Sequence, residues 1–263
     1  TEYKKLLGEK IYTYKAEGKI EDLEKITPEN LYEFYKTFYS TNNIDILVLG
    51  DIDFNNMEKL IEDKFLLKGT QNKVKDFYLS YEKDYSEEIK KTDYSQSTLI
   101  MGSSIKNLTN FEKKYASLAY NIILGSSPNS KLFKNVREKH SYTYNITSRI
   151  NRIDGIFLIQ AGISKENFQR VKEEVLKEIE EMKKGNFSLR DVKNAKEVLL
   201  STLKEITDYQ GSIVDYYFNY LYFDGELYET HKENIQKIDK ESIIKVANKI
   251  NIDTILLAEE IGR

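Results

Sequence analysis

Arg137 and Tyr144 are the two residues of this sequence whose types and spacing could act together chemically. They lie seven residues apart within Leu124 to Ser148, which reads LGSSPNSKLFKNVREKHSYTYNITS. A guanidinium donates from a planar fork and a phenol donates one more hydrogen bond, so the pair suits a peptide carbonyl or a developing oxyanion. The residues alone leave a second interpretation open, in which the arginine makes a surface ion pair and the tyrosine edges the core.

Two elements must position this pair. The stretch Lys131 to Lys139 has apolar residues at helical spacing, and Tyr142 to Ser148 alternates as a strand does. The alternation predicts that Tyr144 shares one strand face with Tyr142, Ile146 and Ser148. A helix followed at once by a strand would let the side chains of Arg137 and Tyr144 converge on one point.

The same segment resembles a motif of the pitrilysin/insulinase-type zinc peptidases, the M16 family. Its pattern is L-G-x-x-x-x-S-x-L-F-x-x-x-R-E-K-x-x-x-x-Y-x-x-x-S, found in the family half that lies opposite the zinc ion. The resemblance implies that Arg137 and Tyr144 hold the substrate backbone and the oxyanion from that side. His140 and Ser141 depart from the pattern, which usually has a small residue or glycine there, so the turn before the strand is expected to differ.

An internal repeat organises the chain. Ile26 to Asp51 returns as Ile238 to Glu259, and each copy reads as a capped helix followed by a buried strand that opens with Asn-Ile-Asp. Much more sequence precedes the second copy than the first. We therefore expect three parts: residues 1–68 as the C-terminal part of a first module, residues 69–96 as a linker with one or two edge strands, and residues 97–263 as a complete second module.

The expected fold class is α+β, an antiparallel sheet covered on one face by helices. Capping patterns begin helices at Thr109 with Glu112 and at Ser188 with Asp191, and Ser164 is expected to begin a third that runs to Lys184. The aromatic run 213–223 could be a ligand surface, but helical spacing favours a helix packed near the sheet. The charges of Lys172 to Lys184 are interpreted as a solvated face.

No zinc site is expected within this chain. By the resemblance, the motif H-x-x-E-H would lie in the part of the first module that this sequence lacks, where two histidines bind zinc and the glutamate activates water. The only histidines here are His140 and His231, and there is no cysteine. Zinc is therefore expected in the full enzyme, either upstream in the same polypeptide or in a separate partner subunit, and this chain alone is expected to be inactive.

Composition and charge indicate which classes of partner this chain is expected to have. The 40 basic and 43 acidic side chains nearly balance, which gives no nucleic-acid footprint. The sequence holds no long apolar run and no signal-peptide pattern near Thr1, so neither a membrane span nor export is indicated. The absence of cysteine fits a reducing, cytoplasmic compartment. We expect a peptide or small-protein substrate, a zinc-bearing half as partner, and self-association through the unpaired edge of the incomplete module.

Two classes of function remain open on the sequence. The chain could be peptidase machinery that grips substrate opposite the zinc, or a non-catalytic peptide-binding or scaffold subunit that kept the fold.

Overall fold

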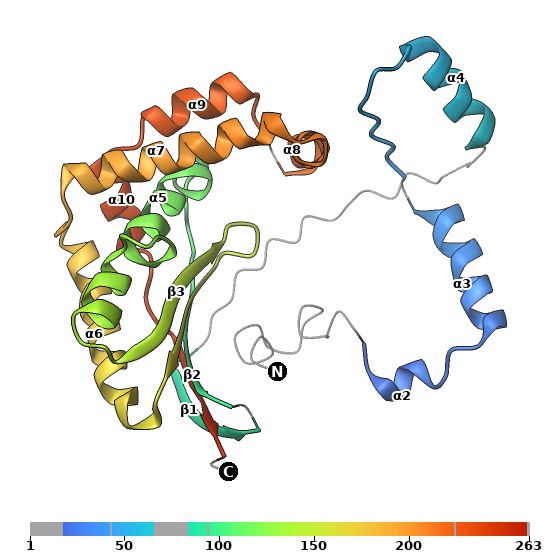
Figure 1. The fold of residues 1–263 in the computed structure, drawn as a ribbon. Helices are drawn as coiled ribbons and strands as arrows, with labels where there is room; N and C mark the ends of the chain where they lie inside the picture. Colours follow the sequence, from blue (N-terminus) through green and yellow to red (C-terminus); the bar gives the residue numbers. More distant parts are fainter. Residues whose placement is uncertain (1–17, 43, 66–83, 94, 224, 262–263) are drawn as a thin grey trace. The chain divides into compact units, whose positions relative to one another are not determined.

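The computed structural model describes residues 18–42, 44–65, 84–93, 95–223 and 225–261 (Figure 1). The chain divides into two compact units. The first contains the described residues from 18 to 65 together with Glu205–Glu226. The second contains those from 84 to Lys204 and from Leu227 to 261, and it holds both Arg137 and Tyr144.

A five-stranded sheet forms the centre of the second unit, in the order β1-β5-β2-β4-β3. Neighbouring strands pair antiparallel except β1 and β5, which are parallel. The strands are β1 (Ser86–Thr92), β2 (Ser97–Ser104), β3 (Thr143–Asn151), β4 (Ile156–Ile163) and β5 (Thr254–Glu260). β2 and β4 pair along their whole length, from Ser97 opposite Ile163 to Ser104 opposite Ile156. β1 lies at one edge of the sheet, and β3 forms the other.

Helices cover one face of this sheet (Figure 1). Near the sheet lie α5, α6 and α10, and α7 and α9 run across the top of the unit in this view (Figure 1). Their bounds are η2 (Glu112–Ala116), α5 (Ser117–Asn121), η3 (Ile122–Ser126), η4 (Phe133–Glu138), η5 (Lys165–Asn167), α6 (Phe168–Lys183), α7 (Leu189–Glu205), α9 (Tyr228–Gln236) and α10 (Lys240–Ala247). The segments η2, η3 and η4 are π-helical, and η5 is a turn of 3₁₀-helix.

The core of the second unit lies between this helical layer and the sheet. Its fully buried side chains come from both layers, including Tyr120 on α5 and Phe157 on β4, whose rings meet edge-on at 5.7 Å between centroids. Burial raises the pKa of the Tyr120 phenol. Strand and helix faces therefore bury the apolar positions that their spacing predicts.

Side-chain caps fix where the helices begin. The Thr109 amide donates to Glu112 at 2.7 Å, and the Glu112 amide donates to the Thr109 hydroxyl at 3.2 Å. Ser188 and Asp191 exchange similar bonds, as do Asp239 and Ser242. The caps predicted at Thr109 and Ser188 are confirmed. The expected cap at Ser164 is not formed, because its side chain makes no capping bond and a 3₁₀ turn precedes α6.

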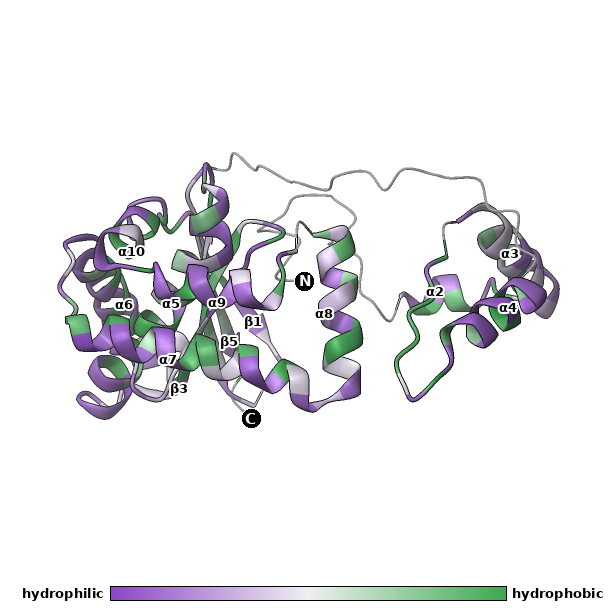
Figure 2. Ribbon diagram, turned by 90° about the horizontal axis from the view of Figure 1, so that it is seen from above, coloured by the Kyte–Doolittle hydropathy of each residue, from purple (hydrophilic) through white to green (hydrophobic). Residues whose placement is uncertain are grey.

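The first unit contains α2 (Ile20–Leu23), α3 (Pro28–Thr41), α4 (Phe54–Lys64), η6 (Ile206–Asp208) and α8 (Gln210–Tyr222). Apolar residues along these helices are largely exposed, and Figure 2 shows several of them in green. The helix predicted within residues 213–223 is confirmed as α8, and its packing near the sheet stays a prediction. Phe218 is 43% exposed and Leu221 is 60% exposed, and α8 belongs to the first unit.

The two copies of the repeat differ in structure. Both helices form, as α3 and α10, each with a side-chain capping box. The second copy continues into β5, whereas residues 44–50 of the first form no strand, and Ile44, Ile46 and Val48 are 40–44% exposed. The predicted buried strand is therefore absent from this copy, because a strand needs a hydrogen-bonded neighbour and the described part of the chain offers it none.

None of the helices within the described ranges combines the length and the apolar run that a membrane crossing needs.

Candidate functional site

The π-helical turn η3, which contains Gly125, packs closely against Ser148 on β3. A Cβ atom added to Gly125 would lie 2.5 Å from the Ser148 Oγ and 2.8 Å from the Leu132 Cδ1, so any larger residue would force these side chains to shift. Ser148 is fully buried and donates a hydrogen bond to the Asn121 Oδ1 at 2.7 Å. The glycine and the final serine of the motif therefore let η3 approach β3 closely.

The helical turn η4 carries Arg137. Leu132 and Val136 are fully buried, as their spacing predicts, while Arg137 is exposed. The Arg137 Cζ lies 4.6 Å from the centroid of the Phe133 ring, one turn earlier, which is a cation–π contact. The guanidinium makes no hydrogen bond or ion pair with another described residue. Its donors are available to a ligand.

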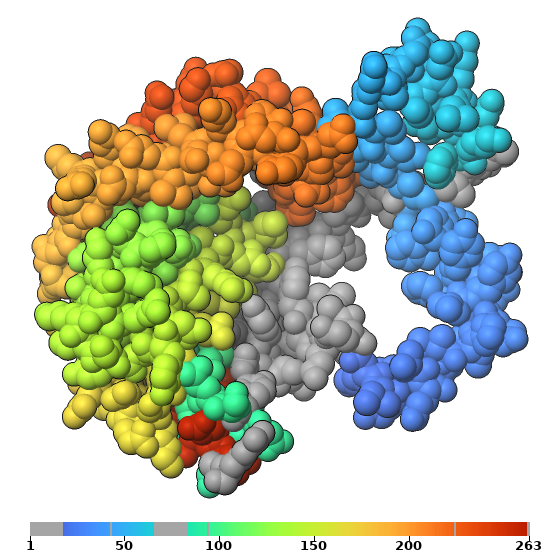
Figure 3. Space-filling model, viewed as in Figure 1, coloured from blue at the N-terminus to red at the C-terminus, as the bar shows by residue number. Residues whose placement is uncertain are grey.

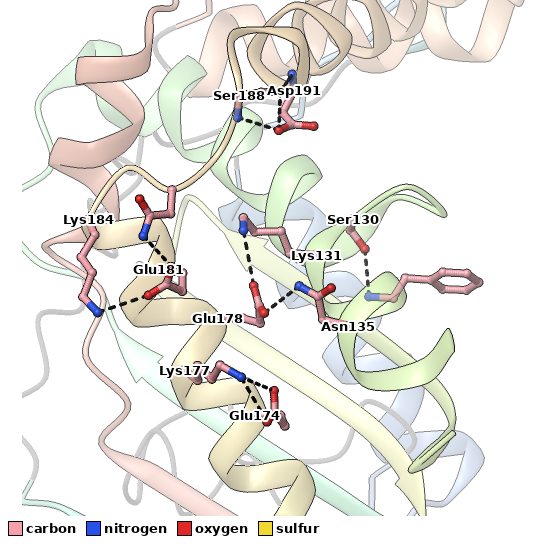
Figure 4. Close-up of polar contacts among 12 residues, drawn as sticks. Ser130, Lys131, Asn135, Glu174, Lys177, Glu178, Glu181, Lys184, Ser188 and Asp191 are labelled. Carbon is pink, nitrogen blue, oxygen red and sulfur yellow. Dashed lines mark hydrogen bonds and ion pairs between the residues drawn. The ribbon is translucent and has the colours of Figure 1, made fainter. Parts of the chain in front are cut away.

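A buried carboxylate anchors this turn to the helix beneath it. Glu178 on α6 is 4% exposed, and it accepts a hydrogen bond from the Asn135 Nδ2 at 2.6 Å and from the Lys131 Nζ at 3.4 Å (Figure 4). The expectation of a solvated face at 172–184 is therefore wrong for Glu178. This residue falls on the apolar stripe of Val175 and Met182, and that spacing is the signal that could have revealed it.

Tyr144 lies on β3, the edge strand, and its side chain is 63% exposed. Its hydroxyl is 3.5 Å from the Ser164 Oγ, at the end of β4. The predicted shared face with Ile146 and Ser148 is wrong, since both of those side chains are buried. The cause is a β-bulge between Thr143 and Asn145. Tyr144 is the extra residue in this bulge, so the two-residue alternation is broken at Tyr144.

The turn from η4 into β3 brings the two candidate residues into one short segment. Ser141 has a φ of 53°, in the left-handed region, at one of the two positions where the resembled pattern has a small residue or glycine. His140 stacks on Tyr142, with 5.0 Å between ring centroids. Arg137 and Tyr144 are both exposed and do not bond to each other. Chemically, they offer a fork of N–H donors and one phenol O–H donor to an acceptor in solvent.

The surroundings of the histidines do not suit a catalytic metal. The His231 Nδ1 is 2.9 Å from the Tyr115 hydroxyl, and His140 is stacked as described above. Among the residues that the structure describes, no group of three or more His, Cys, Asp or Glu side chains could hold a metal ion. A catalytic zinc requires three protein ligands, so the described residues do not fit one.

Figure 3 shows that the green-to-yellow part of the chain, which includes η4 and β3, forms much of one surface of the second unit. On this surface the Arg137 guanidinium contacts only the Phe133 ring among the described residues, and the Tyr144 hydroxyl contacts the Ser164 Oγ at 3.5 Å.

A family model described as "Peptidase M16 inactive domain" matches residues 25–199. The chain belongs to the peptidase M16 family. This confirms the resemblance and, with the sheet described above, the fold class. The match covers the whole segment from Gly125 to Ser148.

Two curated relatives and one solved structure are similar over most of the chain. "Probable inactive metalloprotease YmfF" of Bacillus subtilis is 30% identical over 92% of this chain and 58% of that protein. An "uncharacterized zinc protease" of Rickettsia felis is 26% identical, covering 89% of this chain and 57% of that protein. A conserved protein from Enterococcus faecalis is 24% identical, with a TM-score of 0.84, over 94% of this chain and 59% of that one.

The chain therefore spans a little under 60% of the length of these two curated relatives. One of these relatives is named a probable inactive metalloprotease, and the other is named an uncharacterized zinc protease.

Proposed function

We propose that this chain is the substrate-gripping half of an M16-type peptidase. Arg137 and Tyr144 hold the backbone of an extended peptide and donate hydrogen bonds to the oxyanion, opposite a zinc-bearing half. That half lies upstream in the same polypeptide or in a separate subunit. The chain acts from the cytoplasm on a peptide or small-protein substrate, and without the zinc-bearing half it does not hydrolyse peptide bonds.

One observation carries this proposal: both side chains are exposed and unengaged by other charged groups, yet they project from a segment that is closely packed beneath. Leu132, Val136 and Ser148 are fully buried under it, and Glu178 fixes its helical turn to α6. Donors that are held in place before the substrate arrives need little reorganisation during reaction, and this is the condition for oxyanion stabilisation.

The two donors have different tasks. The guanidinium of Arg137 can bind a peptide carbonyl with two N–H groups and carries a permanent charge, so it contributes to binding and to charge stabilisation. The phenol of Tyr144 donates a single O–H bond, whose strength rises as the acceptor oxygen gains negative charge. Tyr144 therefore acts mainly in the transition state, and Arg137 acts in both states.

A second candidate is a non-catalytic peptide-binding subunit. The family model is described as an inactive domain, and the Bacillus relative is named a probable inactive metalloprotease. In this case Arg137 and Tyr144 still bind peptide but no turnover follows from assembly with any partner. The two functions share the binding step, so peptide binding tests their common basis and turnover separates them.

Peptide affinity tests the common basis. Fluorescence anisotropy with a labelled, extended decapeptide library would measure Kd for the parent chain, Arg137→Ala and Tyr144→Phe. Losing a charge-assisted hydrogen bond of about 1.5–3 kcal/mol should raise Kd about 10- to 100-fold for Arg137→Ala. Lys139→Ala is the matched control, because Lys139 is also an exposed cation and lies two residues after Arg137. Equal losses for Arg137→Ala and Lys139→Ala would show a general charge effect and refute the assignment.

A further inference from the structure

The β-bulge in β3 puts a tyrosine in solvent and a threonine in the core. Thr143 pairs with Ile163 and Asn145 pairs with Gly162, so Tyr144 has no partner of its own on β4. Tyr144 is 63% exposed and Thr143 only 7%. In an unbulged ladder Tyr144 would pair with Ile163, which is 1% exposed and faces the helices.

Burial energy alone opposes this arrangement. The Thr143 Oγ1 is buried without a hydrogen-bond partner in the part of the chain that the structure describes. Burying a hydroxyl unsatisfied is unfavourable, whereas a tyrosine ring gains from burial and can leave its hydroxyl at the edge. Some other interaction must therefore hold the strand in the bulged register.

The side chain of Asn145 supplies that interaction. Its Oδ1 accepts the Gly162 N–H at 2.7 Å, in the place where a regular antiparallel ladder would use a backbone carbonyl of β3. The partner is shaped for this bond. A Cβ atom on Gly162 would lie 2.6 Å from the Asn145 Oδ1 and 2.8 Å from the Gln96 Oε1, so a larger residue would displace the carboxamide.

We propose that Asn145 is a positioning residue, whose carboxamide stabilises the bulge and so turns Tyr144 away from the helix-covered face of the sheet. What Tyr144 does once it is exposed rests on the proposed function, but the turning itself does not. Asn145 does not touch substrate in this scheme. It acts through the register of β3, and without its acceptor the strand takes the unbulged register that buries residue 144.

A single-thiol experiment tests the register directly. The chain has no cysteine, so Tyr144→Cys introduces a unique thiol at the position in question. Reaction with a maleimide would be timed in three backgrounds: Asn145 as it stands, Asn145→Leu, which keeps the bulk but has no acceptor, and Asn145→Asp, which keeps an acceptor oxygen. Buried thiols are far less reactive than exposed ones, so labelling should slow about 10-fold or more in Asn145→Leu. Asn145→Asp should restore the parent rate.

A second thiol separates a register change from loss of the strand. Thr147→Cys lies beyond the bulge on β3, so its labelling rate should be the same with Asn145 and with Asn145→Leu. Labelling of residue 144 that stays fast or becomes faster in Asn145→Leu would overturn the proposal. So would parallel changes at 144 and 147, or slow labelling in Asn145→Asp. The Kd of Asn145→Leu for peptide tests the proposed function separately. Slow labelling of residue 144 with an unchanged Kd would show that Tyr144 does not bind substrate, while the positioning role of Asn145 would stand.

Discussion

Replacing Glu178 should loosen the turn that carries Arg137 more than any other single change to the charges of α6. The Glu178 side chain is 6% exposed, and it bonds Asn135 at 2.6 Å and Lys131 at 3.4 Å, so its removal leaves two donors in a site largely closed to water. Breaking a buried pair at one partner costs about 3–5 kcal/mol. The Lys131 side chain is 21% exposed and can reach solvent, which puts the expected loss for Glu178→Ala near 3 kcal/mol by the same rule.

Glu178→Gln should cost less, because the amide oxygen can still accept one bond. The loss of charge assistance alone is worth roughly 1–1.5 kcal/mol. Glu174→Gln is the control on the same helix. Glu174 pairs with Lys177, whose side chain is 60% exposed, and such surface pairs contribute about 0–1 kcal/mol (Figure 4).

Urea unfolding, followed by far-ultraviolet circular dichroism, measures these differences as shifts in the transition midpoint. The predicted order of destabilisation is Glu178→Ala, then Glu178→Gln, then Glu174→Gln. If Glu178→Ala unfolds within about 0.5 kcal/mol of the Glu174→Gln control, which is the ordinary scatter of surface changes, then the contact is not an anchor and the reasoning fails.

Three further changes test other parts of the account. Gly125→Ala forces a methyl group to within 2.5 Å of the Ser148 Oγ, so it should lower the unfolding free energy by about 1–3 kcal/mol in urea, and an unchanged midpoint would contradict the close approach. Ser141 has a left-handed φ of 53°, which glycine adopts without strain, so Ser141→Gly should raise the free energy of unfolding by about 0.5–1 kcal/mol and raise Tm slightly. A lower Tm would contradict strain at this position. Burial opposes ionisation of Glu112, but hydrogen bonds from Lys249 and Thr109 outweigh it and lower the pKa of Glu112 below its usual 4.5. The stability that this carboxylate contributes should thus be fully present above pH 4.5 and should fall as the pH drops through the lowered pKa. Glu112→Gln should therefore lose less stability than the parent between pH 4.5 and lower pH. An equally steep loss in the variant and the parent would refute this.

The sequence was sufficient for those features that depend on local patterns. Capping boxes at Thr27, Thr109 and Asp239 lie where side-chain spacing places them, because a cap needs only residues three apart. The buried positions Leu132 and Val136 follow from helical periodicity for the same reason. The motif containing Arg137 and Tyr144 was recognisable because its residues are contiguous.

Features that depend on distant partners could not be predicted in this way. The buried state of Glu178 depends on Lys131 and Asn135, more than 40 residues earlier in the chain. The exposure of Tyr144 depends on a bond between Asn145 and Gly162 on the next strand, and a period-two pattern cannot show an inserted residue. Residues 44–50 have the apolar alternation of a strand, but a ladder needs a neighbour that their own sequence does not supply.

The central claim is that Tyr144 stabilises the oxyanion opposite a zinc-bearing half, and the most direct test is turnover. The enzyme would be assembled from this chain and the half that bears H-x-x-E-H, and kcat would be compared for the parent and for Tyr144→Phe, which removes one hydroxyl and keeps the ring. Tyr144→Phe should lower kcat about 100-fold, which is typical for the loss of an oxyanion donor, and should leave Tm unchanged. Equal kcat at saturating peptide, with assembly confirmed, would contradict it.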